Sequence, residues 1–377
     1  MKHDKQMNGT NVLEDAPVSA ASATKKLGYK PRPEVRRRRN IKRALSILWL
    51  IVLLGWIFYP VAARHLDLPA LGGWRTAGII VTAILLFIAL AAGDRRDGRR
   101  LRTIAPMQKF MPYIMARRSD ACNQFSDSLD ISKTEKYCRQ KVREGKTNFT
   151  VLHVFLAAYI RAISQYPALN RFISGQKTYA RNEIVVVMTI KKNMRLDAED
   201  TCIKVRFEPT DTADDVYEKF NAVVQKNQAS EEEKSAFDVL NKVLTLVPGL
   251  LCRWMVKLLT FLDYFGWLPR LFTDLSPFHG SMIITSMGSL GIPPIYHHIY
   301  DFGNLPVFLA YGVKYSEPVL ESDGTVTKHK FVDLKAVTDE RICDGYYYAH
   351  AFRTVKKLFE NPELLDTPVE QVIEDID

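Results

Sequence analysis

Cysteine is scarce in this chain and is never arranged in close pairs. The 377 residues contain five cysteines, none of them in a Cys-x-x-Cys pair, and an odd number cannot all be joined in internal disulfides. A disulfide framework or a zinc site would need paired or clustered cysteines. We therefore expect reduced thiols in a domain that faces the cytosol, and no bound metal.

The largest part of the chain also lacks positive charge, although the whole chain has a formal net charge of +10. Residues 1–43 hold 12 Lys and Arg against 4 Asp and Glu, and residues 94–118 hold 8 against 2. The remainder, residues 119–377, is mildly acidic. Because a nucleic-acid-binding domain concentrates basic side chains on its folded surface, nucleic acid is not an expected partner.

Two long apolar runs lie between the basic segments. At about 1.5 Å per helical residue, Ala44–Ala63 and Thr76–Gly93 are each long enough to cross most or all of a hydrocarbon core of about 30 Å. A short link of low charge, containing proline and glycine, joins them. Lys and Arg gather at the cytoplasmic ends of membrane spans, so we expect a transmembrane hairpin with both ends in the cytoplasm.

A cleaved signal peptide is the alternative interpretation of the first apolar run. The basic segment before that run is too long for a signal peptide, and a second apolar run follows. The sequence thus predicts four parts: a disordered basic cytoplasmic tail over 1–43, a hairpin over 44–93 in contact with membrane lipids, a basic linker over 94–104, and a cytoplasmic domain over 105–377.

The cytoplasmic domain mixes the two kinds of secondary-structure pattern. Helical periodicity predicts helices over Val151–Tyr166, Asp214–Gln228 and Tyr346–Leu365. Short apolar stretches predict buried strands at Ile184–Met188, Met282–Ile284 and Val307–Leu309. Strands and helices interleave without a strict alternation, which favours a mixed α/β domain.

The segment Leu246–Phe272 has an unusually high density of apolar residues with basic residues between them. This composition is typical of a helix that lies at a membrane surface. A helix that covers the core of the domain is the alternative. Asp263, Gly266 and Pro269 argue against a third membrane span.

The most specific motif lies near the C-terminus. Thr338–Gly345 reads Thr-Asp-Glu-Arg-Ile-Cys-Asp-Gly, and the helical segment after it ends in Glu-Asn-Pro-Glu-Leu-Leu. This region resembles the end of the catalytic domain of dihydrolipoamide acyltransferases, where Asp-His-Arg-x-x-Asp-Gly precedes a helix with a similar ending. Chloramphenicol acetyltransferase shares the His-x-x-x-Asp-Gly core. Three segments earlier in the chain resemble other parts of the family and occur in the order that the family predicts. They are Asp130–Ser132, Pro167–Asn170 and Gly280–Gly288.

The resemblance covers about residues 105–365 and implies a chloramphenicol acetyltransferase-like mixed-sheet domain. It implies a homotrimer with its sites between subunits, and coenzyme A or another thioester as the acyl donor. No lipoyl domain or Ala/Pro-rich linker precedes the domain, and a hairpin stands there instead. We therefore do not expect the core of a 2-oxoacid dehydrogenase complex.

The resemblance also assigns roles to individual residues. Thr285, with Ser286 beside it, matches the hydroxyl that holds the oxyanion of the tetrahedral intermediate, a kind of contact often worth a few kcal/mol. Asp344 matches the motif aspartate, which in chloramphenicol acetyltransferase pairs with an arginine near the start of the domain. Arg118 lies at about that place, and Gly345 fits a turn before the last helix.

The family's catalytic histidine is replaced here by Glu340. A glutamate can take a proton when burial raises its pKa, but its negative charge suits a developing oxyanion less well than histidine does. His297 and His298 are alternative bases. Adjacent residues of a strand point to opposite faces, so both are not expected to bind one metal.

Two hypotheses follow. The first is a membrane-anchored acyltransferase that transfers an acyl group from a thioester to an acceptor near the membrane. The second is a non-catalytic trimeric relative that binds or scaffolds. The sequence names neither acyl group nor acceptor, and it assigns no residues to binding of the acyl carrier.

Overall fold

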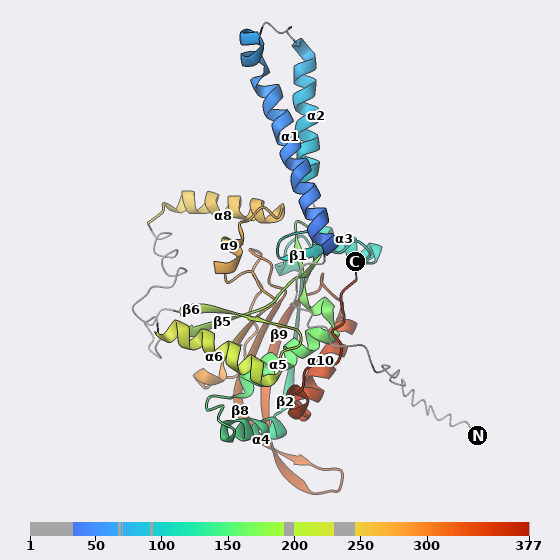
Figure 1. The fold of residues 1–377 in the computed structure, drawn as a ribbon. Helices are drawn as coiled ribbons and strands as arrows, with labels where there is room; N and C mark the ends of the chain where they lie inside the picture. Colours follow the sequence, from blue (N-terminus) through green and yellow to red (C-terminus); the bar gives the residue numbers. More distant parts are fainter. Residues whose placement is uncertain are drawn as a thin grey trace, which may run out of the picture.

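Two long helices form a hairpin at the N-terminal side of the domain (Figure 1). The computed structural model describes residues 33–66, 69, 71–90, 93–191, 200–229 and 246–376. The hairpin consists of α1 (Pro33–Leu66) and α2 (Gly72–Leu90), which contain apolar stretches over Asn40–Leu66 and Gly72–Leu90. By length and composition, both stretches are candidate membrane spans.

The basic segment before the first span belongs partly to the hairpin. The tail was expected to reach residue 43, but α1 already begins at Pro33. Arginine and lysine are good helix formers, and proline is favoured in a first turn, so the helix extends outward from the apolar run. The rest of the expected tail, residues 1–32, lies outside the described residues.

The expected linker is also folded. Gly98–Arg100 forms β1, which pairs antiparallel with β4 (Lys177–Arg181), and β4 pairs with β3 (Arg171–Ser174). Arg95 and Arg99 in this segment are buried. The sequence predicted only a basic linker here, whereas ion pairs and carbonyl contacts take these arginines into the domain.

A six-stranded sheet is the centre of the domain. Its strand order is β2-β9-β8-β7-β5-β6. Only β7 runs parallel to both of its neighbours, and the other pairs are antiparallel. The strands are β2 (Cys122–Asp130), β5 (Ile184–Lys191), β6 (Asp200–Phe207), β7 (Met282–Ser286), β8 (Val307–Leu320) and β9 (Val326–Asp339).

Four helices cover one face of this sheet, which we call the helix face, and form the main core with it. They are α4 (Ser132–Arg143), α5 (Val151–Gln165), α6 (Ala213–Ala229) and α10 (Gly345–Glu360). Helix α5 is apolar around most of its circumference and almost entirely buried, as expected for a helix inside a core. Its first turn has a capping box between Thr150 and His153.

The opposite face of the sheet, which we call the open face, carries no such layer of helices from the described residues. An irregular segment, residues 291–306, crosses it, and we call this the crossing segment. His297 stacks on Phe308 of β8, and the Lys335 ammonium of β9 lies over the ring of Tyr296. Part of the open face stays exposed, including Gln124 and Ser126 of β2.

Short helices lie where the hairpin meets the domain (Figure 1). They are α3 (Pro106–Ile114), α8 (Gly249–Tyr264) and α9 (Arg270–Leu275). Elsewhere in the domain, 3₁₀ turns are formed by Ser119–Ala121, Pro167–Asn170, Gly288–Leu290 and Pro362–Leu365. The expected class, a mixed α/β domain preceded by two long apolar helices, is confirmed.

Candidate active site

The motif loop after β9 is held by one buried carboxylate. Asp339 is fully buried, and its carboxylate oxygens accept hydrogen bonds from Arg341 at 2.8 and 2.7 Å. The guanidinium of Arg118 lies 3.5 Å from the same carboxylate. Two buried positive charges thus fix the end of the strand from which Glu340 projects.

Arg118 does not contact the aspartate that the resemblance assigned to it. Besides Asp339, it donates to the carbonyl oxygens of Ile173, Tyr300 and Asp301. Asp344 instead begins α10, where its carboxylate accepts a 2.9 Å hydrogen bond from the backbone amide of Tyr347. A carboxylate at a helix N-terminus satisfies a free amide and the helix dipole, so Asp344 needs no arginine. Gly345 is the first residue of that helix rather than part of a turn before it.

Glu340 is exposed at the tip of this loop. Its backbone amide donates to the carbonyl of Ala121 at 2.9 Å, which ties the loop to the start of β2. Within the described part of the chain, its carboxylate makes no ion pair with Arg341 or Arg118, because both are turned to Asp339. The side chain is therefore presented to solvent on a fixed backbone.

The two candidate hydroxyls lie on different faces of the sheet. Thr285 and Ser286 are the last two residues of β7, and successive side chains of a strand alternate in direction. Ser286 is registered with Tyr311, a residue of the main core, so it is on the helix face. Thr285 is registered with Ala310 and shares the open face with Phe308 and His297.

Within one copy of the chain, Thr285 and Glu340 lie far apart. Thr285 is registered with Ala310, and Ala310 with Lys335, five residues before Glu340. At about 3.3 Å per residue and about 4.8 Å between strands, the separation is roughly 16 Å along the strands and about 10 Å across them. The hydroxyl lies level with the middle of β9, whereas the carboxylate lies beyond the end of that strand, so the two groups are far apart within one chain.

The two histidines differ in environment. They were expected on a strand, but they lie in the irregular crossing segment. His297 is stacked on Phe308 with ring centroids 4.3 Å apart, and burial, with His298 beside it, lowers its pKa. Its Nε2 atom is buried without a hydrogen-bond partner among the described residues. His298 is exposed and packs edge-on against Tyr300.

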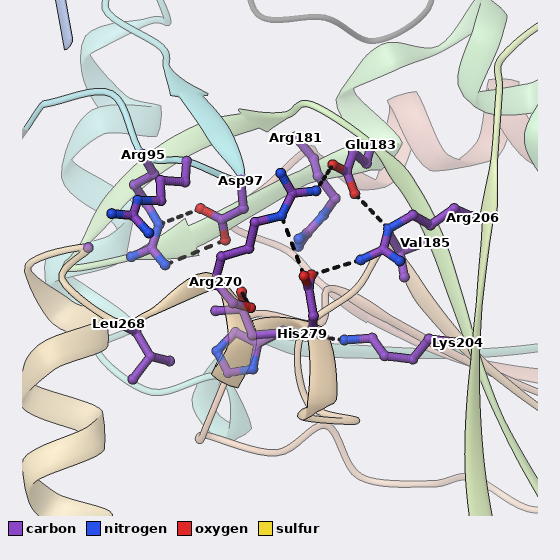
Figure 2. A pocket seen from close by; sticks show the side chains of 14 residues that line it. Arg95, Asp97, Arg181, Glu183, Val185, Lys204, Arg206, Leu268, Arg270 and His279 are labelled. Atoms are coloured by element: carbon purple, nitrogen blue, oxygen red, sulfur yellow. Dashed lines mark hydrogen bonds and ion pairs between the residues drawn. The ribbon is translucent and has the colours of Figure 1, made fainter. Parts of the chain in front are cut away.

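Sequence reasoning missed a second charged site, at the edge of the sheet below α8. Figure 2 shows side chains from β4, β6, α9 and the segment before β1 around a cavity of about 50 Å³. Arg206 and Arg270 both pair with Glu183, and Arg95 pairs with Asp97 (Figure 2). A cavity of this size has room for a few water molecules, not for an acyl carrier.

Lys204 is the unusual member of this site. Its ammonium donates to the carbonyls of Thr273 and Ser276 at 2.8 and 2.7 Å. Burial is the largest cause of a lowered pKa at Lys204, and the positive charges of Arg181 and Arg206 add to it. Together they lower this pKa to about 7. Lys204 and the carbonyl groups that it contacts are about 70 residues apart in the sequence. No sequence pattern predicts such a contact, so this lysine site is seen only in the tertiary structure.

The comparisons with known proteins give likenesses of fold. No family model matches the chain, and no curated protein matches it. A chain from Listeria monocytogenes described as a probable dihydrolipoamide acetyltransferase is 15% identical, with a TM-score of 0.46 over 70% of this chain and 95% of that one. Chloramphenicol acetyltransferase is 11% identical, with a TM-score of 0.41 over 69% of this chain and 99% of that one.

A third likeness is to the cubic core of the pyruvate dehydrogenase multienzyme complex, at 13% identity and a TM-score of 0.43, over 70% of this chain and 93% of that one. At such identities and at TM-scores below 0.5, none of the three indicates what this chain binds or catalyses.

The Asp339→Asn variant tests whether the buried carboxylate holds the loop. The amide keeps the shape but leaves Arg118 and Arg341 buried without their counter-charge, which typically costs roughly 3–5 kcal/mol. The denaturation midpoint of the full chain in detergent should fall strongly. Glu340→Gln, one residue further on and exposed, should leave the midpoint unchanged. Equal midpoints for Asp339→Asn and the wild type would contradict this role.

Lys204 predicts a pH-dependent stability. Between the folded pKa of about 7 and the ordinary value of 10.5, the unfolded chain holds a proton that the folded chain has released. Raising the pH through this window therefore stabilises the folded state. Relative to Lys204→Met, the wild type should gain stability from pH 7 upward. The control Lys328→Met removes an exposed lysine, and its difference in stability from the wild type should stay constant over this pH range. A pH-independent difference between the wild type and Lys204→Met would refute the prediction.

Proposed function

We propose that this protein is a membrane-anchored acyltransferase that acts as a homotrimer. It would transfer an acyl group from coenzyme A or another thioester to an acceptor near the membrane. The observation that carries the proposal is the motif loop, in which Asp339 and two buried arginines present Glu340 to solvent on a fixed backbone. Such a rigid presentation suits a residue that meets a substrate or a neighbouring subunit.

The trimer is proposed because one chain separates the two halves of the site. Thr285 and Glu340 are separated by roughly 16 Å along the strands and about 10 Å across them, so another copy of the chain would be needed to bring one to the other. The crossing segment also exposes apolar side chains: Ile292, Ile295, Tyr296 and Tyr300 are 39–47% exposed. Apolar side chains exposed together mark an interaction surface, and a second copy would cover them.

The chemistry would divide between two subunits. The carboxylate of Glu340 would take the proton of the attacking hydroxyl or thiol of the acceptor. The acceptor oxygen or sulfur would then form a bond to the acyl carbon, and Thr285 of the neighbouring copy would donate a hydrogen bond to the resulting oxyanion. Collapse of this intermediate would break the bond to the carrier, and the proton would pass to the leaving thiolate.

The alternative is a trimeric binding or scaffold protein of the same architecture. The glutamate at position 340, where the resemblance implies a histidine, favours this alternative, because a carboxylate suits a developing oxyanion less well. It needs the same open-face interface but no turnover. Assembly and turnover therefore have to be measured separately.

The first test concerns assembly. The full chain in detergent should sediment as a trimer after correction for bound detergent. Ile292→Asp with Ile295→Asp should convert it to smaller species, because charges would have to be buried at the interface. Leu320→Asp, at an apolar position of β8 outside the crossing segment that is 72% exposed, is the control and should stay trimeric. A monomeric wild type would remove the basis for a shared site.

The second test concerns turnover. The full chain in lipid nanodiscs is supplied with a panel of acyl-CoAs, and release of free thiol is measured. Glu340→Gln should abolish release and keep the assembly, because the amide cannot accept a proton at neutral pH. Glu317→Gln, another exposed position, should retain it.

Loss of activity in His297→Gln or His298→Gln, with Glu340→Gln active, would assign the base to a histidine. If the wild type turns over no acyl-CoA, the enzyme proposal fails and the scaffold alternative stands.

A further inference from the structure

Helix α8 exposes an apolar surface that the described part of the domain leaves uncovered. Within α8 only Asp263 is buried. Leu250 and Trp254 are 70% and 62% exposed, and the other large apolar side chains exposed on the helix are Leu251, Val256, Leu258, Phe261 and Tyr264. The alternative interpretation of this segment, a helix covering the core, is therefore wrong for α8. An exposed apolar face of this size marks an interaction surface.

The position of α8 is fixed against the end of the hairpin. Arg95, five residues after α2, donates to the carboxylate of Asp263 at 2.7 Å and to its carbonyl at 2.6 Å. The ring of Phe265 packs edge-on against Phe87 of α2, with centroids 5.6 Å apart. These contacts hold the C-terminal end of α8 at the level where the chain leaves α2.

Figure 1 shows that α8 runs across the direction of the hairpin, and that α3 lies beside the base of the hairpin at a similar level. Helix α3 also exposes large apolar side chains: Met107, Phe110, Tyr113 and Ile114 are 52–62% exposed. Two separate parts of the sequence thus present apolar surface at one level, next to the end of the second candidate span.

Apart from the buried Asp263, the charged side chains of both helices are basic. Arg253 and Lys257 are the charged residues of α8 before Asp263, and Lys109 is the charged residue of α3. The ammonium of Lys257 lies over the ring of Trp254 at 5.1 Å, which leaves its charge beside the apolar surface. A long basic side chain next to exposed apolar residues matches the boundary between acyl chains and anionic headgroups.

We propose that α8 and α3 lie in the headgroup region of the same bilayer that the hairpin crosses, and that they hold the domain against an anionic lipid surface. The inference rests on the membrane anchor in the proposed function. A soluble protein partner would not explain why both surfaces lie level with the end of α2. A lipid surface accounts for the shared level, the apolar side chains and the positive charge together.

Fluorescence quenching by lipids brominated near the headgroup tests this inference on the full chain in vesicles of phosphatidylcholine and phosphatidylglycerol. The chain has five tryptophans, so a variant that keeps only Trp254 and carries phenylalanine elsewhere reports on α8. Interfacial helices lie roughly 5–10 Å into this boundary, so the emission of Trp254 should fall by about half. The matched control carries Leu320→Trp and phenylalanine at all five natural positions, and its emission should be unchanged.

A variant that keeps only Trp56, within the first apolar helix, separates the two proposals when it is measured in lipids brominated near the ends of their acyl chains, because the middle of a span lies far from the headgroups. If Trp56 is quenched and Trp254 is not, the surface position of α8 is refuted and the anchor survives. If neither is quenched, the anchor fails as well. The single change Trp254→Phe in the natural chain tests the same point. Without Trp254, the share of the tryptophan emission that brominated lipid quenches should be smaller than in the wild type. An undiminished quenchable part would overturn the inference.

Discussion

The guanidinium of Arg95 joins three parts of this molecule. It follows the hairpin directly, it donates to Asp97 and to the side chain of Ser174 in the three-stranded sheet, and it binds both the carboxylate and a carbonyl of Asp263 in α8. A buried arginine without such partners would be very costly, so the three parts are held together or the charge is left unpaired. Together with the packing of Phe265 on Phe87, this contact fixes the end of the hairpin against the domain.

A second buried carboxylate, Asp339, does for the motif loop what Asp263 does for the hairpin. In both places arginine binds a carboxylate and backbone carbonyls together, a geometry that its planar guanidinium suits and lysine does not. One junction orients the domain beneath the candidate spans, and the other orients Glu340. The site and the anchor are thus positioned by the same kind of interaction, and the two junctions meet at β3, where Arg118 donates to the carbonyl of Ile173 and Arg95 to the hydroxyl of Ser174.

Much of the secondary structure could be predicted from local pattern. The expected helix at Val151–Tyr166 is α5, and the run at Ile184–Met188 begins β5, because burial on all sides leaves a continuous apolar signature. The burial of Arg95 and Arg99 in the basic segment 94–104 could not be predicted, since a buried arginine and a solvated one look the same in a sequence. What separates them is a carboxylate distant in the chain, as Arg95 and Asp263 illustrate.

The sequence by itself determined the two apolar helices, the mixed α/β class and the position of the motif, because length, apolarity and short spacing are local properties. Only the tertiary structure decided that Thr285, not Ser286, faces the open side, since a shift of one residue in register would exchange them. It also decided that Arg118 binds Asp339 rather than Asp344. Both carboxylates belong to one short motif, and the strand end buries the first while the helix start satisfies the second.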